Sequence, residues 1–150
     1  VALDEGSDDV QTGAGDDIVC GGPGNDLIKT GPGADTAFGH KGRDKIVGGG
    51  GNDVIEGNQH RDTLTGGNGR DVIRGGTEND TLNGGNGPDI LVGGSEDDAI
   101  NGNKGNDTMR GKAGFDTCRG GAGNDTASGC EAVFGVDLLD GRLLAYRSAA

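Results

Sequence analysis

The chain has 150 residues, a length typical of one domain, and it contains 35 glycines, only four aromatic residues and no tryptophan. Leu, Ile, Val and Phe together number 28, less than a fifth of the chain, and the formal net charge is −12. This composition excludes a globular enzyme domain with a large core, a membrane span of ~18 apolar residues and collagen, which needs glycine at every third residue. It is typical of a disordered chain unless the glycines follow an order of their own.

That order is a period of nine residues, marked by fourteen aspartates that recur without an insertion. Glycine stands two residues before the aspartate in eleven units, and an apolar residue stands two residues after it in every unit. Residues 66–74, Gly-Gly-Asn-Gly-Arg-Asp-Val-Ile-Arg, spell the pattern G-G-x-G-x-D-x-U-x, where U is apolar. The fourteen aspartates are Asp8, Asp17, Asp26, Asp35, Asp44, Asp53, Asp62, Asp71, Asp80, Asp89, Asp98, Asp107, Asp116 and Asp125.

Each unit divides into a glycine-rich part and an apolar part. Glycines at the first, second and fourth positions allow positive φ, so the first six residues are predicted to form a turn. Asn58 and Asn103 replace the second glycine, and asparagine tolerates the left-handed region well. The last three residues, polar, apolar and polar, predict a short strand with its middle side chain inward.

No unit can bury its one inward side chain alone, so the units must stack. The period predicts an all-β solenoid with two units, and hence two strands and two turns, per coil. Fourteen units then make about seven coils, and at ~4.8 Å per coil the stack is roughly 34 Å long.

The acidity of the chain comes from the aspartate ladder. Of the 25 acidic residues, fourteen are in the ladder, which leaves eleven against 13 Lys and Arg. In a solenoid Asp53 lies over Asp71, and carboxylates ~5 Å apart repel by ~1 kcal/mol in water and ~3–4 kcal/mol at an effective dielectric near 20. A cation between the rungs would relieve this repulsion, and carboxylates with turn carbonyls favour Ca²⁺ over Mg²⁺ and over thiophilic metals. Seven turns on each side enclose six gaps, so up to twelve calcium sites are expected.

This pattern resembles the RTX, or haemolysin-type, calcium-binding nonapeptide repeat, and the resemblance covers residues 3–128. It implies a parallel β-roll in residues 1–128, with calcium held between successive turns by turn carbonyls and by the fourteen ladder aspartates. It also implies a secreted, extracellular bacterial protein whose repeats order only when they meet millimolar calcium. The expected function is that of a non-catalytic, calcium-dependent folding and secretion module.

Three units depart from the pattern at the fourth position, where His60, Glu78 and Glu96 replace glycine on the same side of the stack. Three interpretations stay open. The calcium sites between these turns are altered, the two glutamates add an outward ion site, or the side chains simply face water.

Residues 129–150 are more apolar than the repeats, and we expect them to cap the last coil. Asp140-Gly141 between two apolar runs predicts a hairpin turn, with a short helix as the alternative. The chain starts at valine with no predicted cap before Leu3, so we expect a C-terminal piece of a longer protein.

Three cysteines allow one bridge within the chain. Cys20 and Cys118 are about 5.4 coils, or roughly 26 Å, apart, which excludes a disulfide between them. Cys118 occupies an inward position and Cys130 begins the tail, so a Cys118–Cys130 disulfide is predicted to staple the cap. Cys20 then either pairs with a residue outside this chain or is a spare thiol.

Other chemistry is not expected. His40 and His60 fall in predicted turns without a nucleophile at a recognisable spacing, so catalysis is not predicted. The acidic surface argues against nucleic acid as a partner. On the even-numbered strands an outward apolar stripe includes Ile18, Val54 and Ile90. Two interpretations stay open: the stripe packs on an upstream domain or a second copy, or these are ordinary β-branched strand residues without a partner.

Two alternative functions remain. An ice-binding or adhesin-type solenoid would need a regular threonine ladder, whereas the threonines here are dispersed. A secreted hydrolase or lyase could instead carry this module as its C-terminal tail, in which case the chemistry lies upstream.

Overall fold

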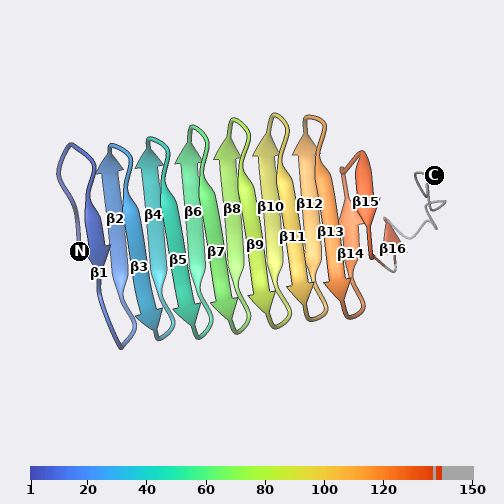
Figure 1. The fold of residues 1–150 in the computed structure, drawn as a ribbon, viewed down its shortest axis with the longest axis horizontal. Coiled ribbons are helices and arrows are strands. Elements are labelled where there is room, and N and C mark those ends of the chain that lie inside the picture. The colour runs from blue at the N-terminus through green and yellow to red at the C-terminus, as the bar shows by residue number, and fades with distance from the viewer. Residues whose placement is uncertain (137, 140–150) are drawn as a thin grey trace.

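The computed structural model describes residues 1–136 and, by their backbone, residues 138–139. They form an all-β solenoid of about seven turns built from parallel strands, as the period of nine predicts. The coils stack along the long axis of the molecule, from β1 at one end to β16 at the other (Figure 1). The described part of the chain contains no helix of the length and apolar character needed to span a membrane.

Two eight-stranded parallel sheets face each other, and consecutive strands alternate between them. The first sheet contains β1 (Asp9–Gln11), β3 (Leu27–Pro32), β5 (Lys45–Gly50), β7 (Thr63–Asn68), β9 (Thr81–Asn86), β11 (Ala99–Lys104), β13 (Thr117–Ala122) and β15 (Ala132–Phe134). The second contains β2 (Ile18–Pro23), β4 (Thr36–Lys41), β6 (Val54–Gln59), β8 (Val72–Thr77), β10 (Ile90–Ser95), β12 (Thr108–Ala113), β14 (Thr126–Ser128) and β16 (Leu138–Leu139).

The register between neighbouring strands is 18 residues, or two units, throughout the repeats. Ile55 pairs with Ile73, and Ile73 with Leu91, so equivalent positions lie directly above one another. The core is therefore a pair of columns with one eighth-position side chain per unit. Val10 in the first unit is half-buried, and the other thirteen are fully or almost fully buried. These residues are Val19, Ile28, Ala37, Ile46, Ile55, Leu64, Ile73, Leu82, Leu91, Ile100, Met109, Cys118 and Ala127.

The strands are longer than the sequence predicts, and the turns are shorter. A typical strand has six residues and includes the first three positions of the next unit, so only positions four to six make the turn. The prediction that the first two glycines belong to the turn was wrong. His40, predicted in a turn, lies in β4 for the same reason. Asn58 and Asn103 do adopt positive φ, 79° and 77°, as predicted.

The segment after the repeats continues both sheets over its described residues. β15 pairs with β13, and β16 pairs with β14, both in parallel. Cys118 and Cys130 form the predicted disulfide, with their Cα atoms 6.0 Å apart. The hairpin predicted at Asp140-Gly141 lies outside the described residues.

Candidate metal centre

The fourteen ladder aspartates form two columns, one at each edge of the roll, because each turn of one unit lies directly over the turn two units earlier. Twelve hydrogen bonds link the rungs: Oδ1 of each aspartate from Asp26 to Asp125 accepts the backbone N–H of the aspartate one coil before it. Their lengths are 2.8–2.9 Å. These bonds hold every carboxylate in one orientation, pointing along the column.

The second carboxylate oxygen is left without a partner. From Asp8 to Asp116, Oδ2 is buried and has no hydrogen bond within the described residues. Most of these side chains are at most 3% exposed, and Asp71 is completely buried. A buried charged oxygen without a partner is costly, so each rung presents a negative group that still needs a proton or a cation.

First-position glycines make room for this oxygen. A methyl group added at Gly48 would lie closer than 3.0 Å to Oδ2 of Asp53 and to the carbonyl oxygen of Gly66. The glycines with the equivalent position against their own unit's Oδ2 are Gly21, Gly39, Gly48, Gly57, Gly66, Gly75, Gly84, Gly93, Gly102, Gly111 and Gly120. None has positive φ, so glycine is required here for space, and the turn conformation does not require it. We refer to each such space as a glycine cradle.

Three units at the N-terminal end lack the cradle because another residue stands first: Leu3, Thr12 and Thr30. Thr30 is completely buried, and its hydroxyl donates to the carbonyl oxygen of Gly48 at 2.9 Å. The hydroxyl of Thr12 donates to the carbonyl oxygen of Thr30 in the same way. In the units that begin with Thr12 and Thr30, a side-chain hydroxyl therefore takes the carbonyl oxygen of the first residue of the unit one coil later.

Burial raises the pKa of the nine ladder aspartates from Asp44 to Asp116. Desolvation raises the pKa of Asp62 to about 8 and the pKa of Asp80 and Asp89 to about 7, against the opposing effect of the backbone N–H bond. The same causes raise the pKa of Asp53 and Asp98 to about 6. Neighbouring rungs add to the rise, because each carboxylate repels the one above it.

The three fourth-position departures keep the turn by adopting positive φ: 76° at His60, 71° at Glu78 and 75° at Glu96. His60 Nδ1 accepts the backbone N–H of Gly42 at 3.1 Å. The charge of Glu78 helps to raise the pKa of both Asp62 and Asp80. Glu96 acts in the same direction on the pKa of Asp98. The backbone path is thus retained at these turns, and the negative charge around three of the rungs is increased.

A residue that the periodicity does not reveal ends one of the columns. Oε2 of Glu131 accepts the backbone N–H of Asp116 at 2.8 Å, the bond that an aspartate Oδ1 makes elsewhere. Glu131 is fifteen residues after Asp116, so it falls outside the period of nine. The only signal in the sequence is an acidic residue soon after the last unit, close to Cys130.

The donor set suits a hard cation. No three His, Cys, Asp or Glu side chains converge in the described ranges, 1–136 and 138–139. What most cradles offer is a carboxylate oxygen beside a backbone carbonyl oxygen of the next coil. All-oxygen sets of this kind fit Ca²⁺, which accepts irregular geometry and many oxygen ligands.

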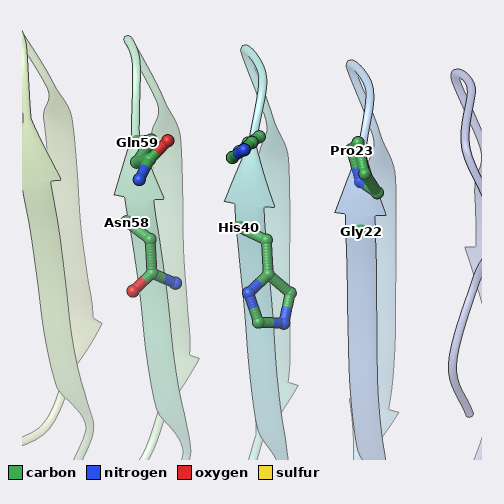
Figure 2. A pocket seen from close by; sticks show the side chains of 6 residues that line it. Gly22, Pro23, His40, Asn58 and Gln59 are labelled. Atoms are coloured by element: carbon green, nitrogen blue, oxygen red, sulfur yellow. The ribbon is translucent and has the colours of Figure 1, made fainter.

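A second hollow lies on the outer face of the roll, where β2, β4 and β6 end. It is a groove of about 390 Å³ lined by Gly22, Pro23, His40, Lys41, Asn58 and Gln59. Figure 2 shows the side chains of His40 and Asn58 lying side by side on neighbouring strands. The lining contains no serine, cysteine or carboxylate, and His40 and Lys41 are its two ionisable side chains.

Comparison of the sequence with known protein families agrees with this geometry. A family model described as the RTX calcium-binding nonapeptide repeat (4 copies) matches residues 4–28, 21–55, 29–64, 56–91, 83–118 and 92–127. The matched segments overlap and run from residue 4 to residue 127. No curated protein matches the chain.

Proposed function

Because the chain belongs to the RTX calcium-binding nonapeptide repeat family, we propose that residues 1–128 are a calcium-dependent folding module of a secreted bacterial protein. Calcium binding is what these repeats do. The proposal adds that the module is non-catalytic, that it acts outside the cell, and that the ladder aspartates are its ligands. The segment 129–150 is its C-terminal cap.

The observation that carries the proposal is the repeated buried Oδ2 without a hydrogen bond. Such a column of carboxylates opposes folding when it is charged and empty, since the rungs repel each other across one coil. Calcium supplies positive charge between the rungs. Ligand binding to the folded state alone shifts the folding equilibrium by mass action, so calcium concentration selects between an unfolded and a folded chain.

The protein's own residues perform the remaining tasks. Oδ1 of each rung holds the turn below through a backbone N–H, which leaves Oδ2 for the metal. The first-position glycine keeps the space beside Oδ2 open, and the eighth-position side chain joins each unit to the core. The units with a cradle are therefore the strongest candidates for full sites, and those beginning with Thr12 and Thr30 are the weakest.

The test compares two substitutions that remove one negative charge each. Asp71→Asn keeps an oxygen for the N–H of Asp53, while Asp97→Asn keeps one for the N–H of Phe115 at a fifth position outside the columns. In calcium titrations followed by far-UV circular dichroism, Asp71→Asn should need more calcium to fold, whereas Asp97→Asn should stay close to the wild type. Equal midpoints for both variants would contradict the assignment of ligands.

A further inference from the structure

The aspartates of the odd-numbered units form one of the two columns, which we call the odd-numbered column: Asp8, Asp26, Asp44, Asp62, Asp80, Asp98 and Asp116. This column has one rung more than the period of nine predicts. At the position 18 residues after Asp116 the chain has Phe134, which cannot be a rung. Glu131 takes this place, because its Oε2 accepts the N–H of Asp116 at 2.8 Å. The same bond has lengths of 2.8–2.9 Å between the aspartates below it. The side chain thus continues the column from a shorter loop.

The space between Asp116 and Glu131 has the features of the repeat cradles. A methyl group added at Gly111 would lie closer than 3.0 Å both to Oδ2 of Asp116 and to the carbonyl oxygen of Gly129. In the repeats, the same two atoms are an aspartate Oδ2 and the carbonyl oxygen of the next first-position glycine. Gly129 and Glu131 therefore reproduce, in three residues, the carbonyl and the carboxylate of a full unit.

The carboxylate below this space is buried and has an unused oxygen. Asp116 is completely buried, and its Oδ2, which points into the space, has no hydrogen bond in the part of the chain that the structure describes. A glutamate placed opposite would add repulsion if the space stayed without a cation. A hydrogen-bonding cap for the N–H of Asp116 alone would not need a second charge.

The disulfide holds the short loop in register. Cys118 lies in the core of β13, and its partner Cys130 directly precedes Glu131. On the other side of Glu131, β15 pairs with β13, so that Thr117 lies beside Ala132. The backbone N–H groups of Glu131 and Ala132 both donate to the carbonyl oxygen of Asp116, at 3.0 Å. The loop is three residues shorter than two units, and the longer glutamate side chain still reaches the rung position.

We propose that Glu131, Asp116 and the carbonyl of Gly129 form an additional calcium site that closes the odd-numbered column, beyond the six gaps between its seven repeat turns. The Cys118–Cys130 disulfide is a positioning element of this site. The proposal rests on calcium binding by the repeats, and it adds a ligand from outside them.

Native mass spectrometry of the full chain, at a free calcium concentration that just saturates the wild type, tests this site. Glu131→Gln keeps an oxygen for the N–H of Asp116 but removes the charge, and it should bind one calcium fewer than the wild type. Glu56→Gln, the same substitution in an exposed pair with Arg74 on the sheet face, should bind the wild-type number. An unchanged count for Glu131→Gln would reduce Glu131 to a hydrogen-bonding cap. A wild type that binds no calcium would instead overturn the function of the repeats.

A second measurement reads the same site through the disulfide. At that calcium concentration, circular dichroism first establishes that both variants are folded. Dithiothreitol should then reduce Cys118–Cys130 several-fold faster in Glu131→Gln than in Glu56→Gln, as followed by thiol labelling, because the bound ion restrains the loop. Equal rates would contradict the link between the ion and the disulfide.

Discussion

At the level of single residues, the decisive feature is a small space beside most of the ladder aspartates, which either stays open or is filled by a side chain. Where the first residue of the unit is glycine, from the unit of Asp26 to that of Asp116, the space is open and the carboxylate oxygen Oδ2 faces it without a hydrogen bond. Thr30 shows what happens when a side chain is present, since its hydroxyl takes the carbonyl oxygen of Gly48. Residues that look like generic turn glycines in the sequence thus have different tasks, and only some of them are needed for φ.

The substitution Gly48→Ala tests the space directly. The added methyl group would meet Oδ2 of Asp53 and the carbonyl oxygen of Gly66 closer than 3.0 Å, and overpacking of this kind costs about 1–3 kcal/mol. We expect a higher calcium midpoint for folding and a lower free energy of unfolding in calcium, measured by denaturant titration.

Gly50→Ala is the matched control in the same unit. Its added methyl group would meet nothing within 4 Å, and its φ is not positive. It should change stability by less than about 0.5 kcal/mol, as surface substitutions usually do. If the two variants behaved alike, the cradle would have no role.

The raised pKa values predict how the metal-free chain responds to pH. The pKa of Asp62 is about 8, those of Asp80 and Asp89 about 7 and that of Asp53 about 6 in the folded roll, above the ordinary value of 3.8. The folded state therefore binds more protons than the unfolded state. Its stability from these groups is fully present below pH 3.8 and is lost as the pH rises through about 6 to 8.

Circular dichroism of the chain freed of calcium should accordingly show more β-structure at pH 4 than at pH 8. Calcium affinity should change in the opposite direction, because protons compete for the same oxygen atoms. A metal-free chain that loses β-structure on acidification would contradict the assigned burial of the ladder.

At the scale of the strands, the spacing of the sequence predicts what repeats and fails at what does not. The period of nine predicts the parallel sheets, the 18-residue register and the core positions, because one inward side chain per unit leaves no other way to bury them. It does not predict that Gly48 and Gly49 belong to a strand, since glycine has low strand propensity. Gly49 is placed there by pairing with Gly31 and Gly67 in the neighbouring coils.

The end of the column also escapes the pattern. The period of nine does not identify Glu131, because Glu131 follows Asp116 by 15 residues, three fewer than the 18 residues of two units. Its position depends on the disulfide and on the pairing of β15 with β13, both of which are tertiary contacts. The disulfide itself was predictable, since Cys118 occupies an inward position at the end of the stack that Cys130 follows.

Loss of this disulfide should weaken the C-terminal end. The bond joins residues 12 apart, and closing a loop of this size stabilises a fold by about 2–4 kcal/mol. The double variant Cys118→Ala/Cys130→Ala should lower the free energy of unfolding in calcium by this amount in urea titrations. Cys20→Ala, which removes the free thiol at the other end, should leave it within about 0.5 kcal/mol. An equal loss in both variants would show that the disulfide adds no stability.

At the scale of the whole molecule, a chain with the composition of a disordered protein folds as a rod with a core one side chain wide in each sheet. Such a core is small for 150 residues, and the two buried acidic columns oppose its formation. Under the proposed function, the folded state is therefore conditional on a cation. Disorder and the β-roll are then two states of one chain, selected by calcium.

Far-UV circular dichroism of the full chain in a chelator, in a few millimolar magnesium and in a few millimolar calcium tests this claim most directly. We expect an unfolded spectrum in the chelator and in magnesium, and a β-sheet spectrum in calcium that a chelator reverses. A β-sheet spectrum of full intensity that persists in the chelator at neutral pH would contradict it.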